Sequence, residues 1–174
     1  MTENRRPVVD DGFRELVRAE QPRLLRLAYG VTGRWASAED AVQAGLEKAY
    51  SAWHLVRRAE DRTAYVRRIV VREAVREAKR QARWGTLEPA AADSAARAVG
   101  SPEDRLDLAA ALAGLSPKQR AVVVLRYVDD LPVAEVARTL SVGEGTVKRQ
   151  CHDALHTLRG LLGPRHVEEA SDAR

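Results

Sequence analysis

The clearest indication of the architecture lies in residues 132–150, which read PVAEVARTLSVGEGTVKRQ. Apolar side chains recur at helical spacing on both sides of the short connection Ser141-Val142-Gly143. The pattern predicts a short helix over 132–140 and a longer one over 144–162. This combination of lengths, with a glycine in the turn, is typical of a helix-turn-helix, although other antiparallel helix pairs share the same spacing.

The second of these helices separates its side chains by character. An apolar stripe contains Val147, Cys151, Leu155, Leu158 and Leu162. The opposite side carries Thr146, Lys148, Arg149, His152 and Asp153. Short polar and basic side chains near a helix N-terminus can reach base edges and phosphates in a major groove, so the helix is a candidate for DNA binding. Plain packing within a helical bundle is the alternative.

A second informative segment runs from residue 57 to residue 83, where ten basic residues outnumber four acidic ones. On a helix at about 100° per residue, small apolar side chains gather on one side and basic side chains on the other. The basic side carries Tyr65, Arg68, Arg72, Arg76, Lys79 and Arg83. Arginines beside an aromatic ring are suited to holding the phosphates and bases of an unstacked single strand. A solvated helix face with an incidental tyrosine is the alternative.

The remaining apolar patterns also predict helices. One covers Phe13 to Val31, and Pro22 should kink or split it. Ser37 and Thr63 are expected to cap the next two helices, and Ser116 with Pro117 the helix whose buried stripe is Ala121, Val124, Leu125 and Val128. The predicted fold class is all-α, with two small helical bundles joined by a flexible linker. The expected boundaries are a flexible tail over 1–11, a bundle over 12–84, the linker over 85–103, a bundle over 104–163 and a tail over 164–174.

Composition excludes several classes of protein. The chain has 174 residues, 45% of them hydrophobic, and a net charge of +4. No stretch approaches the roughly 18 apolar residues of a membrane helix, and the N-terminus lacks the apolar core of a secretory signal, so a cytoplasmic protein is expected. The single cysteine, Cys151, excludes a disulfide framework and a multi-cysteine zinc site. No catalytic motif is recognisable, so neither an enzyme nor a cofactor is predicted.

Taken together, these segments resemble the extracytoplasmic-function (group 4) sigma factors of bacterial RNA polymerase, and in particular the SigE-like actinobacterial type. In the first half the resemblance is carried by residues 13–17 (FRELV), 38–43 (AEDAVQ) and 64–68 (AYVRR). In the second half it is carried by residues 115–120 (LSPKQR), 124–127 (VLRY), 135–137 (EVA) and 145–148 (GTVK). The chain differs from the usual family pattern at Ala44-Gly45, Arg72, Gly143 and Asp153.

The resemblance implies a sigma region 2 bundle over 12–84 and a sigma region 4 helix-turn-helix bundle over 104–163. It implies docking on the β′ clamp coiled coil of core RNA polymerase through Glu39, Asp40, Val42 and Gln43. It implies contact with the −10 promoter element through Tyr65, Arg68, Arg72, Arg76, Lys79 and Arg80. Region 4 would seat on the β flap and read the −35 element through Thr146, Lys148, Arg149 and His152.

Two other functions fit parts of the same sequence. A stand-alone helix-turn-helix regulator would bind operators without polymerase, although the region 2 pattern has no role in that reading. A sigma-like decoy would bind an anti-sigma protein and never DNA. This function leaves the basic side of the helix within residues 57–83 unexplained. An anti-sigma protein is also a possible partner under the sigma-factor interpretation.

Overall fold

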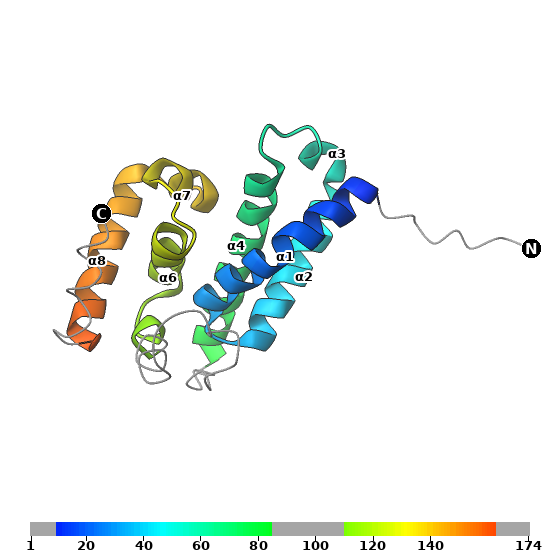
Figure 1. The fold of residues 1–174 in the computed structure, drawn as a ribbon. Helices are drawn as coiled ribbons and strands as arrows, with labels where there is room; N and C mark the ends of the chain where they lie inside the picture. Colours follow the sequence, from blue (N-terminus) through cyan, green and yellow to red (C-terminus); the bar gives the residue numbers. More distant parts are fainter. Residues whose placement is uncertain (1–9, 85–109, 163–174) are drawn as a thin grey trace, which may run out of the picture.

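The computed structural model describes residues 10–84 and 110–162, and within them every regular element is a helix. The all-α fold class is therefore confirmed. Residues 110–113 are helical, and the expected linker over 85–103, most of the N-terminal tail and the C-terminal tail lie outside the described residues. The elements are α1 (Asp11–Thr32), α2 (Trp35–Ser51), α3 (Trp53–Val56), α4 (Arg62–Trp84), α6 (Pro117–Val123), the π-helix η2 (Val124–Val128), α7 (Val133–Leu140) and α8 (Glu144–Leu162) (Figure 1).

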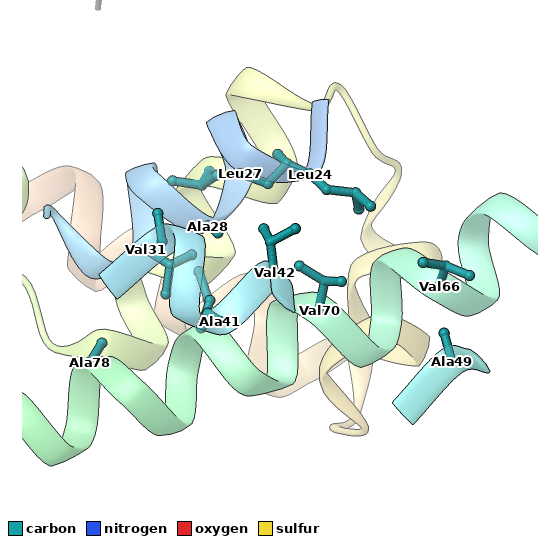
Figure 2. Packing of buried hydrophobic residues seen from close by; sticks show 14 of the residues in the cluster. Leu24, Leu27, Ala28, Val31, Ala41, Val42, Ala49, Val66, Val70 and Ala78 are labelled. Carbon is teal, nitrogen blue, oxygen red and sulfur yellow. The ribbon is translucent and has the colours of Figure 1, made fainter. Parts of the chain in front are cut away.

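The first bundle is built from α1, α2 and α4, which pack along one another. Leu24 and Leu27 of α1 are 1% exposed, and Val66 and Val70 of α4 are fully buried. Figure 2 shows these side chains meeting Val42 of α2 in a common core. Each fully buried leucine or valine contributes about 1.5–3 kcal/mol relative to an exposed one, so this core supplies the main driving force for the bundle.

Gly45 is required for the close approach of α2 to α4. A Cβ at this position would lie 2.6 Å from Cγ2 and 2.9 Å from Cα of Val70. Because Cα belongs to the backbone, the helices would have to move apart to accept it. The departure from the family pattern at Ala44-Gly45 therefore has a packing reason, which outweighs the poor helix propensity of glycine.

The second unit contains α6, η2, α7 and α8. The Ser116 hydroxyl accepts a hydrogen bond from the backbone N–H of Gln119, and the Gln119 side-chain oxygen accepts one from the backbone N–H of Ser116. The predicted cap, with Pro117 following it, is therefore confirmed as a capping box. Leu125, Val136 and Val147 form a buried core between η2, α7 and α8. The helix-turn-helix expected over 132–162 is also confirmed, since α7 and α8 have the predicted lengths and contact each other.

The two units also pack against each other, because α6 and η2 contact α1, and α6 and α7 contact α4 (Figure 1). Val71 of α4 belongs to the core of the second unit, and Ala121 and Val124 belong to the core of the first. Gly30 of α1 allows this contact, since a Cβ there would lie 2.7 Å from Cγ2 of Val124. The helical periodicity of each half of the sequence does not predict how the two units pack against each other.

Two predicted N-caps are wrong, and of the two outcomes expected at Pro22, a kink or a split, the split does not occur. Pro22 does not split α1, because both Pro22 and Arg18 are exposed and water can reach the carbonyl that the missing N–H leaves free. Ser37 does not cap α2, because it lies buried inside this helix and accepts a hydrogen bond from Gln81. Helix α2 begins before Ser37, since Gly33 (φ 72°) ends α1 in a left-handed turn. Asp61, rather than Thr63, caps α4, since its carboxylate accepts from the backbone N–H of Ala64 at 2.8 Å.

The predicted burial of Val128 is also wrong, since this side chain is 62% exposed. The cause is η2, in which the backbone N–H of Asp129 donates to the carbonyl of Val124 at 3.0 Å. The wider π-helical turn rotates Val128 away from the face that an α-helical period predicts, whereas Leu125 stays buried.

Gly45→Ala should lower the free energy of unfolding of the protein by about 1 kcal/mol or more, because the overpacking against Val70 costs more than the helix propensity of alanine returns. Gly160→Ala is the matched control, since a Cβ at that helical position meets nothing within 4 Å. Urea denaturation of both variants checks the expectation. Equal stability of Gly45→Ala and the wild type would contradict the account of the α2–α4 contact.

Candidate nucleic-acid interface

The basic ridge of α4 is largely accessible. Arg72, Arg76, Lys79 and Arg80 are exposed, whereas Tyr65 and Arg68 are half-buried at the start of the ridge. The guanidinium of Arg68 lies over the Tyr65 ring, 4.9 Å from its centroid. The helical-wheel prediction is thus correct for this face, and it combines an aromatic ring with a row of positive charges.

Acidic neighbours hold two of these arginines without neutralising the face. Arg76 pairs with Glu73 at 2.9 Å, and Arg80 pairs with Glu77 at 2.8 Å. The hydrogen bonds that Arg80 donates to the Glu77 carboxylate raise the pKa of Arg80, which stays charged. Because the guanidinium groups of both arginines are exposed, these pairs contribute little free energy, and a phosphate can replace the carboxylate at small cost.

The helix-turn-helix presents a second polar face, on α8. Ser141 adopts a left-handed conformation (φ 54°) that ends α7, and Val147 anchors α8 in the buried core. Lys148, Arg149 and His152 are exposed, and Thr146 is half-buried. The apolar and the polar side chains therefore lie on opposite sides of α8, as the sequence predicts.

Cys151 is half-buried on the apolar side of α8, as predicted for a small packing residue. Its sulfur lies 3.5 Å from the Tyr127 hydroxyl, and this hydrogen bond raises the pKa of Tyr127. In the part of the chain that the structure describes, no group of three His, Cys, Asp or Glu side chains could hold a metal ion.

A groove of about 670 Å³ runs between α1 and α2 on the first bundle. Glu39, Asp40 and Gln43 are exposed along it. The lining also includes apolar and aromatic side chains, namely Phe13, Leu25, Val42, Leu46 and Tyr50. The four residues expected to contact the polymerase are therefore brought together, and the surface combines an acidic rim with an apolar floor.

Sequence reasoning missed a charged cluster between the two units. Arg67 of α4 is 4% exposed and pairs with Glu135 of α7 and with Asp129, whose Oδ2 atom lies 3.6 Å from Nη1 of Arg67. Arg23 of α1 donates to the same Asp129 carboxylate. The signal that could have found Arg67 is its position on the helical wheel, because it falls on the apolar side of α4 beside Val71.

Arg72 also differs from its neighbours on the ridge. Its Nε atom donates to the carbonyl of Thr139 at 3.3 Å, and its Nη2 atom donates to the hydroxyl of Ser141. One residue expected on the nucleic-acid face therefore binds the turn of the helix-turn-helix.

Among the described helices, none is long and apolar enough to cross a membrane.

Comparison with known proteins identifies both halves. Residues 16–84 match the Sigma-70 region 2 family, and residues 111–160 match the Sigma-70, region 4 family. The chain is 35% identical over 159 residues to the RNA polymerase sigma-E factor of Streptomyces antibioticus, covering 90% of this chain and 87% of the relative. It is 32% identical over 145 residues to the ECF RNA polymerase sigma factor SigL of Mycobacterium tuberculosis, covering 80% of this chain and 82% of the relative.

A solved structure has the same fold. The sigma factor RpoE from Bartonella quintana, crystallised with the anti-sigma factor NepR, superposes with a TM-score of 0.72 over 88% of this chain and 98% of that one, at 22% identity. The region 2 and region 4 matches lie one after the other along the chain, and the two sequence relatives are covered to 87% and 82% of their own length. The chain therefore belongs to the extracytoplasmic-function sigma factors of RNA polymerase.

Proposed function

We propose that the protein binds core RNA polymerase and directs it to promoters by contacting the −10 element with α4 and the −35 element with α8. The observation that carries this proposal is the presence, in one chain, of an accessible arginine ridge with an aromatic ring and of a helix-turn-helix with a basic outer face. The first suits a melted strand and the second suits duplex DNA, and initiation requires both.

On α4, the proposed −10 contacts are Tyr65, Arg68, Arg72, Arg76, Lys79 and Arg80. An unpaired base can stack on the Tyr65 ring, and the guanidinium groups can bind phosphates of the same strand in bidentate fashion. Binding a DNA strand in this way requires no catalytic group in the chain itself. The polymerase carries out catalysis, and the sigma factor acts as a positioning subunit in the cytoplasm.

On α8, the proposed −35 contacts are Thr146, Lys148, Arg149 and His152. Their position at the start of the helix behind the turn is the one from which a recognition helix reaches base edges. Lys148 and Arg149 are exposed and have no ion-pair partner among the described residues, so both are available for phosphate or base contacts.

For the polymerase itself, we propose that the α1–α2 groove receives the β′ clamp coiled coil. The acidic rim formed by Glu39 and Asp40 suits basic side chains, and the apolar floor around Val42 and Leu46 suits aliphatic ones. The second unit would seat on the β flap. An anti-sigma protein that covers these surfaces is a further proposed partner.

Arg76→Ala should reduce open-complex formation by about tenfold or more, because a charge-assisted contact is worth about 1.5–3 kcal/mol. Binding to core polymerase should stay unchanged. Permanganate footprinting of the melted strand measures the first quantity, and gel filtration with core polymerase measures the second. Arg58→Ala, an exposed arginine off the ridge, is the control. Loss of core binding in Arg76→Ala would refute the assigned role.

Lys148→Ala should flatten the salt dependence of promoter binding, because one fewer phosphate contact lowers the log–log slope by about 0.9. The measurement is a titration of the holoenzyme against a promoter duplex between low and moderate salt. Lys118→Ala, an exposed lysine at the start of α6, serves as the control. A slope that matches the wild type would mean that Lys148 touches no phosphate.

Asp40→Lys should weaken binding to core polymerase by about tenfold, since reversing one charge in a complementary interface costs more than 1 kcal/mol. Fluorescence titration of core polymerase into labelled protein measures the dissociation constant. Glu15→Lys makes the same charge change at an exposed α1 position outside the groove. If both variants bind like the wild type, the groove is not the docking site.

A further inference from the structure

Helix α8 carries a carboxylate on the face that is proposed to contact duplex DNA. Asp153 is exposed, whereas Val147, Ala154 and Leu158 are buried against the rest of the second unit. At about 100° per residue, Asp153 points away from this buried stripe and lies within about 40° of Arg149. One positive and one negative side chain therefore share the outer face of α8.

The Asp153 carboxylate has no role in holding α8 together. In the described part of the chain it forms no ion pair, and the Thr157 hydroxyl donates at 3.0 Å to the backbone carbonyl of Asp153 rather than to its side chain. Arg149 precedes Asp153 by four residues, and a base before an acid is the less favourable order for a helix ion pair. Aspartate is also a poor helix former in a helix interior. Local stability therefore does not explain a carboxylate at this position.

The outer face of α8 is accessible in the folded chain. Helix α8 packs on α6 and α7, at the side of the second unit that lies away from the first bundle (Figure 1). Arg149 and Asp153 are both exposed on it. Because four residues span about 6 Å of helix, the two side chains can reach base pairs that lie roughly two steps apart in a major groove.

The chemistry of a carboxylate restricts what Asp153 can contact there. An ionised carboxylate only accepts hydrogen bonds, and phosphates repel it, so its favourable partners are amino groups on the base edges. Guanine and thymine present acceptors in the major groove, whereas cytosine presents its N4 amino group and adenine presents N6 beside the acceptor N7. Cytosine is the base that offers a donor without an acceptor of its own next to it.

We propose that Asp153 is a specificity-determining residue of α8, which accepts a hydrogen bond from the N4 amino group of a cytosine in the −35 element. This inference rests on the proposed function and deepens it, since it names a base that the helix selects. The cytosine should lie within about two base-pair steps of the base pair that Arg149 contacts.

Selection of promoter duplexes by the holoenzyme tests this assignment. Core polymerase with the full chain is incubated with a library randomised over the −35 and −10 elements, and the bound duplexes are sequenced. The wild type should prefer cytosine at one −35 position by roughly fivefold or more, which is the discrimination that a good base contact provides.

Asp153→Asn keeps the shape of the side chain and removes its charge. The variant should shift the preference at that one position from cytosine towards adenine, because an amide can accept from N6 and donate to N7. It should also bind the library as a whole more tightly, since a negative charge near the phosphates is gone. A purely structural role of Asp153 would predict neither effect. Circular dichroism verifies that the variant keeps its helix content.

The matched control is Glu15→Gln, which makes the same change from carboxylate to amide at an exposed position on α1. It should leave the base preferences and the overall binding as in the wild type. A loss of the cytosine preference in Asp153→Asn but not in Glu15→Gln would support the assignment.

The results that would overturn the inference differ from one that would overturn the proposed function. Identical base preferences of Asp153→Asn and the wild type at every −35 position would remove Asp153 from base recognition and leave the proposed function intact. A wild-type preference for guanine or thymine at the position that the variant alters would refute the choice of cytosine. A wild-type holoenzyme that selects no −35 sequence would contradict the proposed function, and the role of Asp153 with it.

Discussion

The burial of α4 on two sides is the constraint on which the rest of the structure depends. Val70 and Ala74 face α1 and α2, whereas Val71 faces the second unit, and all three are fully buried. Only a narrow strip of the helix is left for solvent, and the basic ridge lies along that strip. Close approach requires small residues at the contacts, which is why Gly45 and Gly30 lie against valines of neighbouring helices.

The arginines of α4 show that one residue type can serve different purposes along a single helix. Arg76 and Arg80 lie on the ridge with exposed guanidinium groups, and a phosphate can displace their carboxylate partners Glu73 and Glu77. Arg67 is buried among carboxylates of another unit, where removing a partner is costly. Arg72 stands between these cases, since it is exposed but already donates to α7 and its turn. Position on the helix, rather than charge, separates these arginines.

Local signals in the sequence predict a large part of this architecture. The Ser116 capping box, the helix-turn-helix around Ser141 and the two faces of α4 follow from the spacing of a few residues. The sequence predicts Ser37 as an N-cap and not as a buried partner of Gln81. The reason is that α1 ends at Gly33, so α2 starts early enough to include Ser37. It also misses η2, whose wider turn exposes Val128, and the contacts of Arg67, whose partners lie more than 60 residues away. For the candidate site, composition and period locate the exposed faces, but they cannot show that part of one face is covered by the second unit.

One small chain offers a groove, a ridge and a helix-turn-helix on separate elements of an all-α fold, and the proposed function uses all three. Its most direct test is to add the purified protein to core RNA polymerase on fragmented genomic DNA and to sequence the 5′ ends of the transcripts. The account predicts discrete new start sites that share sequences near −10 and −35. Unchanged start sites with measurable core binding would contradict it and indicate a decoy. Unchanged start sites without core binding would contradict it in favour of a DNA-binding regulator that acts alone.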